Sequence, residues 1–437
     1  MPWIVGFFGS VWLSASLYLI IKSFNFEKNT MWIIAVGGLL TTNITVISTI
    51  STYLHDFDAN MFALLMATLA FYYWKKDSVN NYIKMSICLV LSMGIYQSYI
   101  QVTISLIIID SIIALLGNKK FNNIFIHGLK AIATILVSIC FYAILVKIVI
   151  TFSGVALQDD GYNSVFGFTK ISIDTIGKLI YECYYYYVYY GFYIPWLDGT
   201  SFALVIHGLT FLICFALITH KIFKNNIRGK ELMLLMVLLA IIPLGSNGIY
   251  IISNGAKHHV MEYAIYLDYL FFVLLLDINQ NSKFIKSFSI MLIVIILSEN
   301  IRTANATYFK KGLEYDATKS YMTNVLYDMN KTEGYIPGET KVMFIGYPDF
   351  SYRMDNMEYI YRISGNYYSF AIQKYKNYDA FFKYVLQQPL NLIIEDKQYR
   401  LAIENKPEIK EMGYYPSTDS VKLVDDVLIV KFADSGY

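Results

Sequence analysis

Long apolar runs separated by short polar segments fill the first 300 residues of the chain. Runs of roughly 17 to 25 residues have the length of a helix that crosses a bilayer. The shortest runs meet at residues 96–99 and are also compatible with one kinked or re-entrant pair. We place ten spans at residues 3–22, 31–51, 59–74, 85–96, 100–117, 128–151, 201–220, 231–247, 261–277 and 285–299. The pattern therefore predicts a polytopic α-helical membrane protein.

Lysine and arginine gather in alternate loops between these spans, whereas the intervening loops carry mainly aspartate and glutamate. Cytoplasmic loops carry an excess of basic residues, so we expect the basic loops inside and the acidic loops outside. This assignment puts Met1 outside, and we expect one helix and one outer loop to be missing from the front. The basic groups are Lys22 and Lys28; Lys75, Lys76 and Lys84; Lys119 and Lys120; Lys221, Lys224, Arg228 and Lys230; Lys283 and Lys286.

The longest outer segment, residues 152–200, contains a stretch with helical periodicity at 171–190. Its apolar positions share one face, and it ends in a run of tyrosines. Because tyrosine favours the membrane interface, we expect an amphipathic helix lying on the outer surface. Two roles are open: a simple aromatic anchor, or a contact surface for lipid or sugar.

After residue 300 the apolar runs stop and charged residues become common. We therefore divide the chain into a transmembrane domain, 1–300, and a small α/β domain, 301–437, which the alternation places outside the membrane. Its pattern predicts helices at 303–331 and 368–386, strands at 341–346 and 391–394, and a hairpin at 421–430 that turns at Asp425–Asp426. It contains no phosphate loop, so an acceptor platform or a cap is expected.

Composition supports this class and narrows the partners. The chain is 56% hydrophobic and 16% charged, whereas soluble domains average about 25% charged residues. A net charge of +2 without a concentrated basic face excludes nucleic acid as a partner. The four cysteines have no CxxC spacing, so we expect no disulfide framework. We expect no cofactor, and a divalent metal requirement is left open.

The first candidate cluster for chemistry is His55, Asp56 and Asp58, between two apolar runs. Carboxylates at the edge of a bilayer are expensive and are functional hypotheses by default. Residues at i and i+2 do not share a helix face, so the two aspartates have different roles. Asp58 is the expected N-cap of the following helix, and capping alone would explain it. Asp56 is freer to act as a base or to bind hydroxyl groups.

The second cluster is Tyr96, Gln97, Ser98 and Tyr99 together with Gln101, a polar insertion that we expect at the opposite depth from the first cluster. Buried amides and phenols must be hydrogen-bonded, which suits recognition of sugar hydroxyls. Hydrogen bonds that hold the helices together are an equally good explanation.

The third cluster is Lys257, His258, His259 and Glu262, the strongest cationic feature on the predicted outer face. Adjacent histidines point in different directions, so a metal site made by this pair is unfavourable. A lysine beside a histidine suits a phosphate group, with a plain interfacial loop as the alternative.

A few ionisable residues lie within the spans themselves, namely Asp110, Lys147, Asp268 and Asp277. Most are close to a span end, where a long side chain can reach the interface. Only Asp268 is deep enough to require a partner.

Residues 52–65, the step at 94–99 and the helix at 300–316 resemble the Gtr-type (GtrII-like) bacterial glucosyltransferases, which have the polytopic GT-C architecture. The resemblance extends over nearly the whole chain. It implies a bacterial plasma-membrane enzyme that takes a sugar, such as glucose, from a polyprenyl-phosphate carrier. The acceptor implied is a cell-envelope glycopolymer on the outer face, and no nucleotide donor is needed.

The resemblance also implies roles for the residues above. GT-C enzymes keep a catalytic acid in their first outer loop, and that loop is the one expected to be missing here. Either the chain is a fragment, or Asp56 takes the role of base in an inverting displacement. Lys257 and His258 would lie near the phosphate. Tyr96 and Gln97 would lie on the sugar.

Three other function classes stay open at this point. A transporter or flippase for lipid-linked sugars would use outer carboxylates for coupling, but it should show two related halves, and the sequence has no internal repeat. A polymerase of envelope polymers would need arginines in a large outer loop, and residues 152–200 contain none. A non-catalytic subunit of a glycosylation complex is the third alternative.

Overall fold

The computed structural model describes residues 2–26, 29–154, 173–192, 200–255, 258–279, 283–348, 371–372, 375–394 and 397–434. The chain forms two compact units, Met1–Asn305 and Ala306–Tyr437. The division falls inside one long helix, α13 (Lys283–Lys331).

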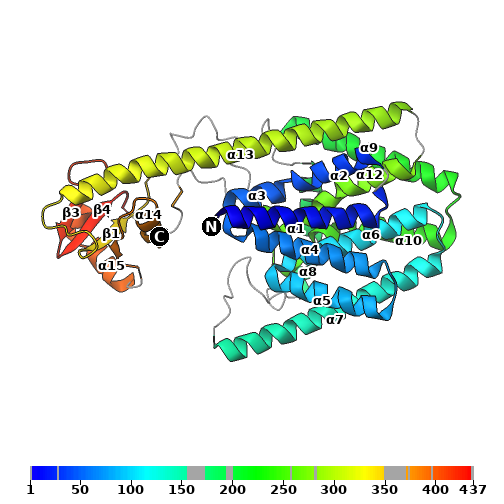
Figure 1. Ribbon diagram of the computed structural model, residues 1–437, viewed down its shortest axis with the longest axis horizontal. Coiled ribbons are helices and arrows are strands. Elements are labelled where there is room, and N and C mark those ends of the chain that lie inside the picture. Colours follow the sequence, from blue (N-terminus) through cyan, green and yellow to red (C-terminus); the bar gives the residue numbers. More distant parts are fainter. Residues whose placement is uncertain are drawn as a thin grey trace. The chain divides into compact units, whose positions relative to one another are not determined.

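The first unit is a helical bundle (Figure 1), and each of the ten predicted spans contains a helix. Six of the described helices are long and apolar enough to cross a membrane singly, and a bent pair, α2 with α3, would make a seventh. This arrangement is that of a polytopic membrane protein, and the number of ten spans stays a prediction. The helices are α1 (Pro2–Ser23), α2 (Thr30–Thr41), α3 (Ile44–Thr52), α4 (Phe57–Trp74), α5 (Val79–Ile95), α6 (Ile100–Leu116), α7 (Phe121–Ser153), α8 (Ile173–Phe192), α9 (Thr200–Lys224), α10 (Gly229–Asn247), α11 (Ile249–Ile252), α12 (Leu267–Ile278) and the first part of α13. Single 3₁₀ turns are η2 (Leu54–Asp56), η3 (Gln97–Tyr99), η6 (His259–Met261) and η7 (Tyr263–Tyr266).

The predicted span at 31–51 is broken into α2 and α3, which meet at an angle of 44°. Asn43 explains the break, because its side-chain oxygen accepts from Val46 N at 3.2 Å and its amide donates to Leu40 O at 2.8 Å. Asparagine at an N-cap replaces the missing helical bonds of the next segment. Helix α3 therefore starts anew and ends beside the candidate site.

Hydrogen bonds join the basic loops at one end of the bundle, which we call the basic end. The Lys75 ammonium donates to Ser23 O at 2.6 Å, and the Asn225 amide donates to Leu116 O at 2.6 Å. Lys75 also pairs with Asp110 at 2.7 Å. These basic loops therefore lie together at one end of the bundle.

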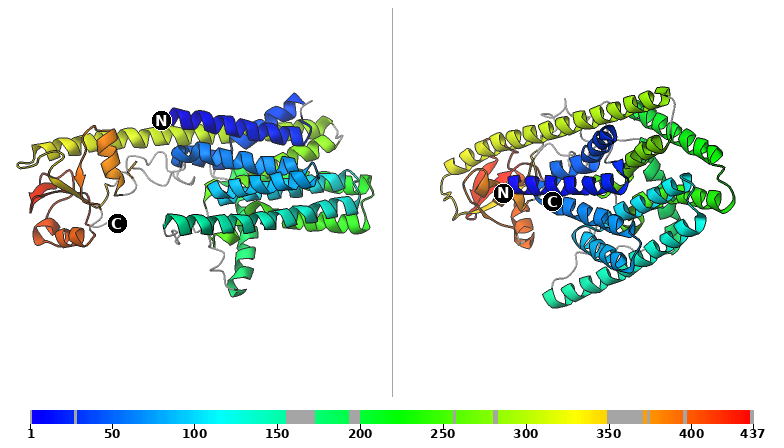
Figure 2. Two further views of the ribbon diagram at one scale, coloured as in Figure 1. Left: turned by 60° about the horizontal axis from the view of Figure 1, so that its bottom comes forward. Right: turned by 45° about the vertical axis from the view of Figure 1, so that its right-hand side comes forward.

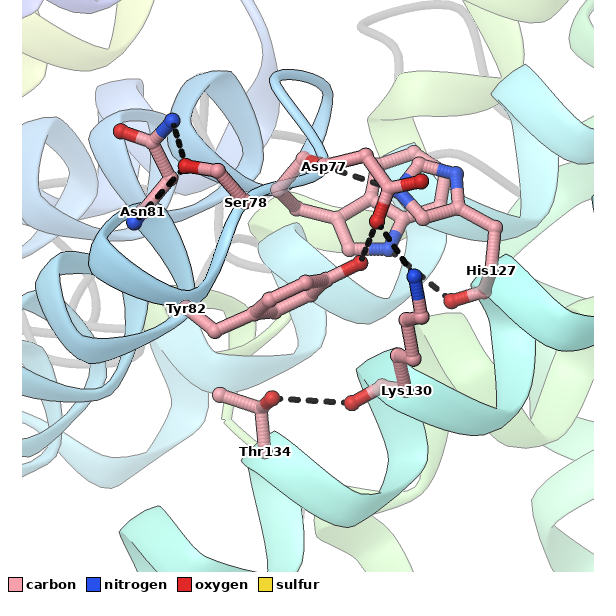
Figure 3. A network of polar contacts seen from close by, with 8 residues as sticks. Asp77, Ser78, Asn81, Tyr82, His127, Lys130 and Thr134 are labelled. Carbon is pink, nitrogen blue, oxygen red and sulfur yellow. Dashed lines mark hydrogen bonds and ion pairs between the residues drawn. The ribbon is translucent and has the colours of Figure 1, made fainter.

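A compact polar network at the basic end ties α7 to α4 and α5 (Figure 3). The His127 ring stacks on Trp74 with centroids 4.0 Å apart, and its Nε2 is 3.0 Å from Trp74 O. Asp77 accepts from the Lys130 ammonium and from the Tyr82 hydroxyl, each at 2.8 Å. This network fixes the start of α7.

Helix α8 covers most of the predicted surface helix at 171–190 and lies across the direction of the long helices (Figure 2, left). One face is held by the bundle, because Tyr187 donates to Asp268 at 2.5 Å and Tyr250 donates to Glu182 at 2.6 Å. The prediction that Asp268 needs a partner is confirmed. The opposite face exposes Tyr181, Tyr185 and Tyr189, whose rings follow one another 6.3 to 6.4 Å apart.

The second unit contains a four-stranded sheet of order β2-β1-β4-β3. Strands β1 (Lys341–Ile345), β2 (Asn391–Leu392) and β4 (Val427–Lys431) are parallel, and β3 (Val421–Val424) is antiparallel to β4. The predicted hairpin is confirmed, because Asp425 and Asp426 both have positive φ, 48° and 59°, as a tight two-residue turn requires.

Alternate residues of β1 and β4 face two separate cores of the second unit. Phe344 and Val430 pack with residues of α13 and α14 (Asn377–Tyr384). Met343 and Ile429 pack under α15 (Lys397–Glu404) and α16 (Pro407–Lys410). The predicted helix at 368–386 is helical at α14, and its residues 368–370 and 373–374 lie outside the described residues.

Candidate functional site

The candidate site begins at η2, which runs directly into α4 and carries His55 and Asp56. Phe57 anchors this turn: it is 3% exposed, and its ring fills the space that a side chain at Gly9 of α1 would need. With Phe57 inside, the two preceding side chains point outward. His55 Nε2 lies 3.1 Å from Asp56 Oδ2, and these side chains are 74% and 54% exposed.

The prediction that Asp58 is the N-cap of the helix is wrong. Helix α4 starts at Phe57, and the cap position falls on Asp56, whose side chain makes no capping bond. Asp58 is in the first turn, where its Oδ1 accepts from Ala59 N at 2.9 Å. The 3₁₀ turn before Phe57 continues into the helix without an extended residue, so no side chain takes a capping geometry. A carboxylate in the first turn still favours the helix dipole.

A segment about 200 residues later in the sequence lies against this turn. His258 Nε2 is 3.3 Å from the Tyr53 hydroxyl, with the rings 5.5 Å apart. One residue further on, His259 O accepts from the Thr45 hydroxyl of α3 at 2.7 Å. The first and third clusters of the sequence therefore meet at the end of the bundle opposite the basic end, which we call the site end.

The histidines of this segment are less exposed than His55: His259 is buried and His258 is partly buried. His259 is 7% exposed and Glu262 is 3% exposed. Burial lowers the pKa of His259 to about 3 and also lowers the pKa of His258. Both rings are thus neutral near pH 7, and a buried neutral imidazole is a weak ligand for a phosphate charge. Lys257 lies outside the described residues.

The second cluster also lies at the site end, so the expected opposite depth is wrong. Tyr96 and Tyr53 pack against the same buried cluster, which consists of Ile249, Val260 and Met261. The cause is that α5 returns from the basic end to the level at which α4 began. Gln97 donates to the Tyr142 hydroxyl of α7 at 2.9 Å, a bond that links helices.

Gln101, the second residue of α6, is 2% exposed and bonds across the bundle. With its amide oriented to satisfy both atoms, it donates to Ser246 O at 2.8 Å and accepts from Gly248 N at 3.2 Å. These bonds hold the junction of α10 and α11, which leads into the 258–262 segment. The amides of Gln97 and Gln101 thus form hydrogen bonds between helices, and contact with sugar hydroxyls stays a prediction.

The structure adds two residues that sequence reasoning did not single out, Tyr53 and Tyr142. Tyr53 adjoins the aspartate cluster, but nothing in the sequence indicates its contact with His258. No group of three His, Cys, Asp or Glu side chains that could hold a metal ion occurs within the described ranges.

Residues 1–276 match a family described as Glucosyl transferase GtrII. The match takes in all three clusters and ends in the last turns of α12. The chain belongs to the GtrII glucosyl transferase family. The matched region is shorter than the nearly complete resemblance expected from the sequence. None of the curated proteins and none of the solved structures matches this chain. Membership makes the chain a glucosyltransferase, with a sugar donor and an acceptor.

Proposed function

We propose that this protein transfers a glucosyl group from a polyprenyl-phosphate carrier to a cell-envelope glycopolymer on the outer face of a bacterial plasma membrane. The observation that carries the proposal is the meeting of Tyr53, the His55–Asp56 pair and His258 at the end opposite the basic loops. The positive-inside rule puts that end on the outer side. The long apolar helices suit a donor that stays in the lipid.

Asp56 is the base in this proposal. Its carboxylate is half exposed and bonded to an imidazole, so an acceptor hydroxyl can reach it. Asp56 removes the proton of the acceptor hydroxyl while the hydroxyl oxygen attacks the anomeric carbon opposite the carrier phosphate. The new bond inverts the anomeric centre, and the bond to the carrier phosphate breaks. Such general base catalysis contributes about 10²- to 10⁴-fold. His55 orients the carboxylate, and Asp58 supports the first turn of α4.

The substrate contacts in the proposal come from the other two clusters. Tyr96 and Gln97 border the site from the α5–α6 junction and would contact the sugar. The 258–262 segment, with His258, His259 and Glu262, would border the substrate next to Tyr53. Lys257 would offset negative charge on the departing phosphate. The second unit, residues 306–437, would present the acceptor outside the membrane.

The test is glucosyl transfer from a labelled polyprenyl-phosphate glucose to envelope polysaccharide of the native cells, with the full chain in membranes. Asp56→Asn should lower kcat about 100-fold or more and leave KM for the donor nearly unchanged. Asp58→Asn should change kcat by less than about 10-fold, because a charge in the first turn contributes about 0.3–1 kcal/mol.

Asp316→Asn is the matched control, since this exposed aspartate of α13 is far along the sequence from every cluster. It should retain full activity. A wild-type chain that transfers no sugar from this donor would overturn the proposal. Equal losses in Asp56→Asn and Asp58→Asn would overturn the assignment of the base.

A further inference from the structure

The bonds of His258 define where its proton lies. Val260 N donates to His258 Nδ1 at 3.4 Å, so this side chain caps η6. A nitrogen that accepts a bond carries no hydrogen, and a neutral imidazole has one donor and one acceptor. The proton is therefore on Nε2, which donates to the Tyr53 hydroxyl at 3.3 Å.

Tyr53 lies between the His55–Asp56 turn and the 258–262 segment. It ends α3, and its carbonyl accepts from Asp56 N at 2.9 Å, which closes η2. Its ring centroid lies 6.3 Å from that of His55 and 5.5 Å from that of His258. One tyrosine thus contacts both the turn that holds the proposed base and the 258–262 segment.

We propose that Tyr53 and His258 form a positioning pair that fixes the His55–Asp56 turn against the 258–262 segment, with His258 acting as a neutral Nε2 donor. The inference rests on the proposed function, because it concerns the same site. It changes the role of His258, which then orients the site through Tyr53 instead of carrying charge to a phosphate.

The mechanism of the pair follows from its geometry. The Thr45 hydroxyl donates to His259 O. This bond holds the 258–262 segment in place relative to α3, so the segment can hold Tyr53 in place. Holding Tyr53 by its ring and its hydroxyl restricts the turn that begins at its carbonyl. A misplacement of about 1 Å at a reacting group can cost about 100-fold in rate. By restricting that turn, Tyr53 and His258 would raise kcat without contacting the substrate.

The test is a double-mutant cycle on Tyr53→Phe and His258→Asn in the glucosyl transfer assay. Asparagine keeps an acceptor for Val260 N, as an N-cap, but is too short to reach the Tyr53 hydroxyl. Each single variant should lower kcat about 10-fold or more, with little change in KM for the donor. The double variant should lose no more activity than the single variant that loses more.

His258→Gln separates the two bonds of the imidazole. Its amide reaches as far as Nε2 and can donate to Tyr53, so it should recover more activity than His258→Asn. Tyr82→Phe removes a tyrosine hydroxyl bond at the basic end and should leave transfer unchanged.

Additive losses in the cycle, with wild-type transfer intact, would overturn the positioning pair and leave the proposed function standing. A rise in KM without loss of kcat in His258→Asn would also overturn it, since that result indicates direct phosphate binding. Absence of transfer by the wild-type chain would instead count against the proposed function itself.

Discussion

The two ends of the first unit hold their carboxylates in different ways. At the basic end, Asp110 pairs with Lys75 and Asp77 pairs with Lys130. At the site end, hydroxyl or imidazole groups lie against the carboxylates: Tyr187 against Asp268, Tyr250 against Glu182 and His55 against Asp56. The described cation closest to these is Lys178, 3.8 Å from Glu182 and itself largely exposed.

This difference fits a structural role for the basic end and the proposed catalytic role for the site end. A lysine offsets the charge of the carboxylate that it contacts, so the paired carboxylate stabilises the fold and is a weaker base. A neutral donor stabilises a carboxylate without cancelling its charge. In the proposed function, the exposed Asp56 carboxylate can therefore accept the proton of an acceptor hydroxyl, whereas the ion pairs of the basic end hold the helices together.

We expect the largest loss of kcat from a change in the packing that positions Asp56, the proposed base. Gly9→Ala puts a methyl group into the Phe57 ring, and overpacking costs about 1–3 kcal/mol. Because Phe57 anchors the His55–Asp56 turn, we expect kcat to fall about 100-fold in the transfer assay. Gly6→Ala, one turn away on α1 with open space around it, is the control. Full activity in Gly9→Ala would show that the turn is not fixed by Phe57.

The basic end should respond in stability rather than in kcat. Lys75→Met leaves Asp110 partly buried without its cation, which costs about 3 kcal/mol. The midpoint of thermal unfolding of the solubilised protein should fall, and the added Asp110→Leu should restore most of it. Lys119→Met, an exposed lysine at the same end, should change nothing. A loss of kcat at permissive temperature would contradict the separation of the two ends.

The site end should lose stability in acid. The pKa of His259 is about 3 because of burial, whereas an unfolded histidine has a pKa of about 6.5. The unfolded chain therefore binds this proton first, and stability falls as the pH drops from about 6.5 toward 3. At pH 5 the loss is about 2 kcal/mol. Thermal unfolding of His259→Gln should show a smaller dependence on pH over this range than wild type, and an equal dependence would refute the assignment.

Periodicity and charge predicted the helices, the alternation of loops and the Asp425–Asp426 hairpin, because each depends on neighbouring residues. The sequence also indicated that Asp268 needs a partner, yet it could not name Tyr187 of α8. Contacts between distant segments leave no local pattern, and the Tyr53 bond to His258 is the clearest case. The Asp58 cap was wrong for a related reason, since the burial of Phe57 against Gly9 decides where α4 begins.

The smallest effect is expected for the exposed pair at the basic end. Lys130 and Asp77 are 47% and 49% exposed, and pairs of this kind contribute about 0.2–1 kcal/mol. The Lys130 ammonium, with the Tyr82 hydroxyl, holds the pKa of Asp77 below its ordinary value. Lys130→Met should lower the unfolding midpoint slightly, and high salt should reduce the difference because it screens the pair in wild type. Transfer should be unaffected, because the His127 stack on Trp74 still holds α7; a strong loss of kcat would mean that the basic end controls the site through α7.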